Sequence, residues 1–377
     1  MTANSSMVDP DGLMEFSVVF TDRSLNHMSA AFRKVMTDIS GLLKEVYNAD
    51  AAIIVPGGGT YAMEAVARQF ATDRKTLVIR NGWFSYRWSQ IFDAGDIPSE
   101  QIVLKARAVG NDLPAPYAPC PIDDVVKSIR DERPNVVFAP HVETSSGIML
   151  PDSYMKAVAD VAHEVGALFV LDCIASGTVW VDMKATGVDV LISAPQKGWS
   201  SSPSAGLVTL SERAVTALQS TKSSSFSVDL GKWHQIMQAY ENGGHAYHST
   251  MPTDALTRFR DTMLETQALG FDKLRDQQLE LGSSVRKLLA EHGFKSVAAA
   301  GFEAPGVVVS YTDDPDIQNG KKFAEQGMQI AAGVPLMCDE PDGFSTFRLG
   351  LFGLEKLADT NAAVEKLNTV LSKINAA

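Results

Sequence analysis

Residues 188–200 read VDVLISAPQKGWS, and in this stretch a strand-like run stops shortly before a lysine. The run VDVLIS (188–193) is apolar and rich in β-branched residues, which is typical of a buried strand. Lys197 follows it among small and polar residues. A lysine in this place is either a surface residue at a strand end or a partly buried amine. A buried amine has a lowered pKa and acts as a nucleophile, so the surrounding sequence has to separate the two interpretations.

Other apolar runs resemble this strand and lie at 51–55, 76–79, 101–104, 135–140, 167–172 and 205–210. Several are apolar almost throughout instead of alternating, which predicts a sheet that is covered on both faces. Helix-like segments, among them 61–71, 122–131 and 152–165, separate most of the runs. The β-α-β order predicts an α/β fold with a large, mainly parallel, doubly wound sheet flanked by helices. Ligands bind such sheets at the carboxyl ends of the strands.

The C-terminal part of the chain has a different organisation. Residues 211–250 are rich in serine, glycine and histidine and weakly periodic, whereas 253–292 show one long helical pattern. Strand candidates follow at 306–311 and 344–351, and an amphipathic helix begins at Glu355 and closes the chain. We therefore expect an N-terminal arm (1–20), a large domain (21–262) and a smaller C-terminal α/β domain (263–377).

The composition narrows the possible partners. The 377 residues include 33 lysines and arginines against 45 aspartates and glutamates, a net charge of −12, which argues against binding nucleic acid or an anionic membrane surface. Three widely spaced cysteines argue against a disulfide framework or a cysteine-based zinc site. The histidines show no metal-ligand spacing, so we expect no metal. With no signal-peptide pattern and no apolar run of about 20 residues, we expect a cytoplasmic protein without a membrane segment.

Residues 55–65 read VPGGGTYAMEA, where a strand-like run ends in glycines and a helix-like segment follows. Glycines let the backbone approach a ligand closely, and free N–H groups at a helix start, together with the Thr60 hydroxyl, bind anions. The stretch is neither a P-loop nor a G-x-G-x-x-G motif. By itself it is compatible both with an anion site and with a simple turn.

Two more strand-like runs end in polar residues. Asp172 ends the run in ALFVLDCIASG (167–177), where a carboxylate either caps the next turn or keeps a pyridine nitrogen protonated. Thr144 lies in HVETSSGIMLP (141–151), a row of hydroxyls after a strand whose plain role is to cap the helix-like segment from 152.

Taken together, a strand that ends in aspartate, a second strand and then Ser-x-x-Gln-Lys resemble fold-type I pyridoxal-phosphate enzymes. More closely, the chain resembles class V aminotransferases of the alanine–glyoxylate and serine–glyoxylate type, over about residues 24–353. The resemblance implies the cofactor pyridoxal 5′-phosphate (PLP). It implies that Lys197 forms a Schiff base with PLP and later moves a proton between cofactor and substrate, and that Asp172 pairs with the pyridinium nitrogen.

The same resemblance assigns the remaining residues of the cofactor site. Ile174 and Phe84 lie against the two ring faces, and Thr144 lies near the phenolic oxygen. The phosphate-binding residues are Gly58, Gly59, Thr60 and Gln196.

Two further assignments concern the neighbouring subunit and the substrate. Tyr247 and Thr250, in AYHSTMP (246–252), match residues that reach the phosphate of the neighbouring subunit's cofactor, which implies a homodimer with shared active sites. Arg348, in STFRLGLFG (345–353), matches the arginine that binds the substrate carboxylate through a bidentate pair. The implied reaction moves an amino group from a small amino acid, such as alanine or serine, to a 2-oxo acid, such as glyoxylate or pyruvate, in a ping-pong cycle.

The sequence departs from the family pattern in two places. Relatives usually open with a Gly-Pro-Gly segment that lines the substrate site, whereas the matching region here reads EFSVVFTDRSLNHMS (15–29). The phosphate turn has Gly58 where many relatives have serine, so one hydroxyl is missing. Both changes bear on the choice of substrate and not on the fold.

Two alternatives to a transaminase remain. Cys338, in VPLMCDEPDG (334–343), raises the possibility of a cysteine desulfurase or lyase of the same fold. Those enzymes typically place histidine before the lysine, whereas this chain has Gln196, and the segment around Cys338 lacks small residues. A catalytically silent PLP-binding homologue would more often have lost Lys197 or Asp172, and both are present.

Overall fold

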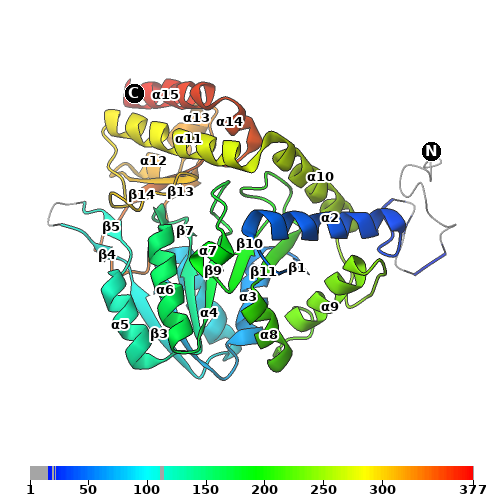
Figure 1. The fold of residues 1–377 in the computed structure, drawn as a ribbon. Helices are drawn as coiled ribbons and strands as arrows, with labels where there is room; N and C mark the ends of the chain where they lie inside the picture. Colours follow the sequence, from blue (N-terminus) through cyan, green and yellow to red (C-terminus); the bar gives the residue numbers. More distant parts are fainter. Residues whose placement is uncertain (1–15, 19–20, 22, 111–113, 377) are drawn as a thin grey trace.

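The computed structural model describes residues 16–18, 21, 23–110 and 114–376. Its central sheet consists of β1 (Ala51–Pro56), β2 (Lys75–Arg80), β3 (Glu100–Lys105), β6 (Val136–Pro140), β9 (Leu168–Asp172), β10 (Val190–Ser193) and β11 (Ala205–Leu210). The strand order is β1-β11-β10-β9-β6-β2-β3 (Figure 1). β11 runs antiparallel to β1 and β10, and all other neighbours are parallel. The predicted mainly parallel sheet is therefore confirmed.

Helices cover both faces of this sheet. Every residue of β6, β9, β10 and β11 is buried, and because successive side chains of a strand point to opposite faces, neither face is open to solvent. The helices are α2 (Ala30–Tyr47), α3 (Gly59–Phe70), α4 (Trp83–Gly95), α5 (Ile122–Glu132), α6 (Asp152–Glu164), α7 (Met183–Thr186), α8 (Glu212–Ser220) and α9 (Leu230–Glu241). Two short hairpins complete this part, β4 (Arg107–Ala108) with β5 (Tyr117–Ala118), and β7 (Val142–Glu143) with β8 (Ile148–Met149).

The C-terminal elements gather at one end of the molecule (Figure 1). They are α10 (Thr253–Leu269), α11 (Phe271–Glu291), β12 (Val307–Tyr311), α12 (Pro315–Gln318), α13 (Lys321–Glu325), β13 (Ala331–Ala332), β14 (Thr346–Gly350), α14 (Leu354–Ala358) and α15 (Thr360–Ala376). The three strands form an antiparallel sheet in the order β12-β14-β13, and Leu281, Phe347 and Leu371 belong to its own apolar cluster. The predicted domain boundary after residue 262 falls within α10 and stays a prediction. The predicted arm (1–20) lies mostly outside the described residues.

The structure corrects one expectation about helices and adds two helices that were not expected. The single long helix expected over 253–292 is two helices, because Gly270 takes a φ of 96° between α10 and α11. The weakly periodic segment 211–250, for which we named no element, contains α8 and α9. Side chains cap both helices: Ser211 accepts a hydrogen bond from the N–H of Ala214, and Asp229 accepts one from the N–H of Lys232. Such capping residues mark helix starts even where apolar periodicity is weak.

The strand directions bring distant segments together. β1, β2, β6, β9 and β10 run in the same direction, so their carboxyl ends lie at the same edge of the sheet. The segments that leave these ends are 57–60, 81–84, 141–144, 173–174 and 194–197. The ring and phosphate contacts that the large domain is predicted to make with its own cofactor therefore start from one edge.

Candidate active site

A cavity of about 400 Å³ lies at this edge of the sheet. The predicted residues that line it are Gly59, Thr60, Phe84, Thr144, Asp172, Ile174, Gln196, Lys197 and Arg348. Gly58 directly precedes α3 as its N-cap. The structure thus brings together residues from five segments of the large sheet and one strand of the small sheet.

Lys197 lies in the turn after β10 and is partly buried. Burial lowers the pKa of its amine, and the Arg348 guanidinium lowers this pKa further. The amine nitrogen lies 5.5 Å from the centroid of the Phe352 ring. Among the described residues no carboxylate lies within ion-pair distance of it. Lys197 is therefore a partly buried amine and not a surface residue at a strand end.

Asp172 is the last residue of β9, and its side chain is buried. One carboxylate oxygen accepts a hydrogen bond of 2.9 Å from the N–H of Ile174. Burial raises the pKa of Asp172 to about 7, and the Glu143 carboxylate acts in the same direction. The Ile174 N–H and the Arg87 guanidinium oppose this rise in the pKa. A buried carboxylate without a cation in contact is suited to pair with a ligand that carries a protonated nitrogen.

The phosphate turn and Gln196 offer polar groups that lack partners. No side chain caps the start of α3, and the Tyr61 N–H bonds to the Gly58 carbonyl oxygen, which leaves the N–H groups of Gly59 and Thr60 to an anion. The Gln196 amide oxygen is buried and has no hydrogen-bond partner in the part of the chain that is described. A Cβ atom on Gly59 would lie 2.4 Å from Cδ1 of Ile174, so these two residues meet closely at the wall of the cavity.

Phe84 is held by a buried carboxylate that the sequence analysis did not single out. Glu143 is completely buried and accepts hydrogen bonds from the N–H groups of Phe84 (3.1 Å) and Ser85 (2.9 Å) at the start of α4. It also accepts hydrogen bonds from Ser145, through the N–H (3.1 Å) and the hydroxyl (2.8 Å). A carboxylate among hydroxyls at a strand end was the signal in the sequence.

Arg87 is a second cavity residue that the sequence analysis did not single out. It lies one turn after Phe84 on α4, and its guanidinium carbon is 5.2 Å from the centroid of the Phe84 ring. Residues three apart on a helix share a face, so the position of Arg87 could have been inferred once α4 was placed.

Arg348 comes from the small sheet. It lies on β14, opposite Val309 of β12 and Ala331 of β13, and its Nε donates a hydrogen bond of 2.8 Å to the carbonyl oxygen of Ala332. Burial lowers the pKa of its guanidinium, and Glu143 opposes this effect. No ion pair of Arg348 occurs within the described ranges. The rest of its hydrogen-bonding edge is available to a ligand.

Tyr247 and Thr250 do not line this cavity. The Tyr247 side chain is 58% exposed, and its hydroxyl lies 3.3 Å from the Thr250 hydroxyl. The predicted contact with the cofactor of a neighbouring subunit stays a prediction.

The chain matches the family model of class V aminotransferases over residues 15–334. It belongs to this family. The predicted family and its fold are thereby confirmed, and the family implies a PLP cofactor and aminotransferase activity.

Relatives of known name cover most of this aminotransferase. A protein named soluble hydrogenase, small subunit, of Synechococcus sp. is 25% identical over 93% of this chain and 88% of its own length. The 2-aminoethylphosphonate–pyruvate transaminase of Paraburkholderia phymatum is 25% identical over 93% of this chain and 92% of its own. The crystal structure of an alanine–glyoxylate aminotransferase of Nostoc sp. covers 93% of this chain and 89% of that one, with a TM-score of 0.78 and 22% identity. This last likeness shows the fold alone.

The cavity of this class V aminotransferase fits PLP. Asp172 offers a buried carboxylate for the ring nitrogen, and Lys197 offers an amine for the aldehyde. The uncapped start of α3 suits the phosphate. The buried amide oxygen of Gln196 has no partner among the described residues, which is expected where a polar ligand binds.

Cys338 has the surroundings of a structural residue. It is buried and absent from the cavity lining, and its thiol donates to the carbonyl oxygen of Arg80 at 3.4 Å. Burial raises the pKa of this thiol to about 12, so it stays protonated. These surroundings give no support to a desulfurase that would use Cys338 as its nucleophile.

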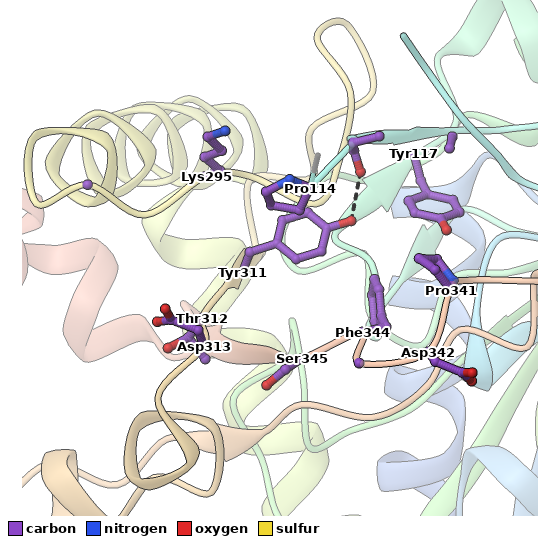
Figure 2. Close-up of a pocket in the computed structure, with 14 residues that line it drawn as sticks. Pro114, Tyr117, Lys295, Tyr311, Thr312, Asp313, Pro341, Asp342, Phe344 and Ser345 are labelled. Atoms are coloured by element: carbon purple, nitrogen blue, oxygen red, sulfur yellow. Dashed lines mark hydrogen bonds between the residues drawn. The ribbon is translucent and has the colours of Figure 1, made fainter. Parts of the chain in front are cut away.

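A larger cavity of about 590 Å³ lies elsewhere on the enzyme (Figure 2). Tyr117, Tyr311 and Phe344 line it, and the Tyr311 hydroxyl donates a hydrogen bond of 2.7 Å to the carbonyl oxygen of Ala115. Its described lining includes none of the residues assigned to the cofactor. Among the described residues, no helix is long and apolar enough to span a bilayer, and no cluster of three or more potential metal ligands occurs.

Proposed function

We propose that this class V aminotransferase uses PLP to move the amino group of a small amino acid, such as alanine or serine, to a 2-oxo acid such as glyoxylate or pyruvate. The observation that carries the proposal is one cavity that joins the partly buried amine of Lys197, the buried carboxylate of Asp172 and the guanidinium of Arg348. When bound, PLP supplies an electron sink that makes the α-proton of an amino acid acidic.

Each of these side chains has a distinct task. Lys197, with its lowered pKa, takes a proton from the substrate α-carbon and returns it. The ionised carboxylate of Asp172 holds a proton on the ring nitrogen. Arg348 binds the substrate carboxylate through two parallel hydrogen bonds and so sets the direction of the reacting C–H bond.

The neighbouring side chains confine the ring and favour a small substrate. Phe84 and Ile174 face the cavity from different elements, and Thr144 adds a hydroxyl. A space of about 400 Å³ has to accommodate both cofactor and substrate, which argues against a long side chain. Pyruvate appears in the name of one relative and glyoxylate in that of a structural neighbour, and both are 2-oxo acids.

The assembly that we propose is a homodimer with shared active sites, in the cytoplasm. Tyr247 and Thr250 are exposed and lie outside the cavity of their own chain, which supports a role at a partner's site. Chains that carry both Tyr247→Phe and Thr250→Ala should bind PLP poorly. Mixed with Lys197→Ala chains, they should form heterodimers that regain a share of active sites. Full PLP affinity in the double variant would contradict the sharing.

The reaction itself is tested with the purified full-length chain and PLP. Alanine, serine, aspartate and 2-aminoethylphosphonate are each paired with glyoxylate and pyruvate, and the cofactor absorbance and the products are followed. Lys197→Ala should abolish turnover, whereas the control Lys184→Ala, which changes an exposed lysine, should retain it. Borohydride reduction and peptide mapping should place the cofactor on the 193–200 peptide. A label on another lysine would overturn the proposal.

A further inference from the structure

Arg87 places a positive charge beside the phosphate turn, near enough to the Asp172 carboxylate to lower its pKa but not in ion-pair contact with it. Its Nη1 atom donates a hydrogen bond of 3.1 Å to the Thr60 hydroxyl, and its guanidinium packs over the Phe84 ring. Within residues 23–110 and 114–376 no carboxylate lies within ion-pair distance of Arg87. A partly buried guanidinium of this kind is normally neutralised, so a negatively charged ligand is expected at this point.

The other charges of the cavity have assigned partners. The cations in its described lining are Arg87, Lys197 and Arg348. Under the proposed function, on which this inference rests, Lys197 bonds to the cofactor aldehyde and Arg348 binds the substrate carboxylate. Asp172 neutralises the ring nitrogen. A phosphate monoester carries a charge of about −1.5 to −2 at neutral pH, and only Arg87 remains to balance it.

The neutral groups of the turn leave room for such a role. Gly58 contributes no hydroxyl, and no atom lies within 4 Å of a Cβ built on it. Gln196 offers an uncharged amide, and the start of α3 offers backbone N–H groups. A guanidinium has five N–H donors in a planar fork, and the contact with Thr60 occupies only one of them.

We propose that Arg87 binds the phosphate group of PLP directly. Its guanidinium supplies the positive charge that the turn at 57–60 lacks, and the hydrogen bond to Thr60 fixes that hydroxyl toward the same group. Because Arg87 also packs over Phe84, one side chain joins the phosphate end of the site to the ring end.

The test compares PLP with pyridoxal, which lacks the phosphate. Equilibrium dialysis of the full-length chain with each compound gives two dissociation constants for the unmodified protein, Arg87→Gln and Arg87→Lys. Arg130→Gln, which removes an exposed arginine that pairs with Glu164, is the charge-matched control. Circular dichroism checks that each variant is folded.

The expected result is specific to the phosphate. Arg87→Gln should raise the Kd for PLP by about 10- to 100-fold and leave the Kd for pyridoxal within about threefold, because a charge-assisted hydrogen bond is lost. Arg87→Lys should lose less, since it keeps the charge but not the fork. Arg130→Gln should change neither constant, and inorganic phosphate should compete with PLP less well in Arg87→Gln than in the unmodified protein.

Two outcomes would overturn the assignment. Equal weakening of PLP and pyridoxal would show that Arg87 acts only by packing against Phe84. An unchanged Kd for PLP, with a raised KM only for amino donors that carry a second anionic group, would place Arg87 at the distal end of the substrate. If the unmodified chain binds neither compound, the proposed function itself fails, and the inference fails with it.

Discussion

Replacing Asp172 by asparagine should remove a loss of stability that the cofactor-free protein undergoes as the pH rises from acidic to neutral. Burial holds the pKa of this carboxyl group at about 7 in the folded chain, against 3.8 in a model compound. Between these two values the folded protein binds more protons than the unfolded chain. The free energy of unfolding therefore falls as the pH rises from about 4 to about 7, and no further loss from this group follows above that. Asp172→Asn removes this titration.

The magnitude follows from the two pKa values. The interval from pH 5 to the folded-state pKa of about 7 spans about two pH units. Over each unit the free energy of unfolding falls by about 1.36 kcal/mol. The cofactor-free protein thus loses about 3 kcal/mol through Asp172 between pH 5 and pH 8. All other groups titrate in both proteins. The stability of Asp172→Asn relative to the unmodified protein should therefore rise by about 3 kcal/mol over this range. With PLP bound, Asp172→Asn should instead be less stable than the unmodified protein, because asparagine cannot neutralise a protonated ring nitrogen.

Urea unfolding of the cofactor-free proteins at pH 5 and pH 8 measures this difference. Asp189→Asn is the matched control, because Asp189 is also buried but accepts hydrogen bonds from the Phe169 N–H and from Ser211 and His163. It should be less stable than the unmodified protein at both pH values, by about 1–3 kcal/mol. A gap between Asp172→Asn and the unmodified protein that stays constant from pH 5 to pH 8 would refute the inference that Asp172 is a buried carboxylate without a cation.

Three further changes test the cavity. Gly59→Ala should raise the Kd for PLP about tenfold or more, since the new Cβ would displace Ile174. Gly58→Ala should bind PLP almost normally, because its Cβ has open space and Gly58 has an extended φ of −167°. Equal effects of the two changes would contradict this geometry. Arg348→Lys should raise KM in both half-reactions and lower kcat with cofactor affinity unchanged, and an unaltered KM would exclude the carboxylate contact. Glu143→Gln should lower the free energy of unfolding by about 2–4 kcal/mol in urea, because two N–H groups at the start of α4 lose a charged acceptor; a loss below about 0.5 kcal/mol would argue against this.

Local sequence determined the strands and the chemistry at their ends. Buried parallel strands need apolar side chains on both faces. The continuous apolar runs at 51–55 and 188–193 can therefore be recognised as strands from the sequence alone. Because all ligand-facing loops of such a sheet leave the same edge, the polar residues that follow the runs could be grouped from their order alone. The resemblance to class V aminotransferases then assigned Lys197 and Asp172 their roles, and the structure places both side chains in one cavity.

Tertiary structure decided whatever depends on segments that are distant in the chain. The pKa of Asp172 follows from burial by several elements, and the availability of Arg87 follows from the absence of a carboxylate within ion-pair distance of it among the described residues. Neither property can be inferred from the residues that adjoin Asp172 or Arg87 in the sequence. Glu143 stabilises the start of α4 across 58 positions of sequence, a contact for which local periodicity carries no signal. The sheet edge could be foreseen from residue patterns, but the charges that meet there depend on how the whole chain packs, because burial and Coulomb interactions act through space and not along the chain.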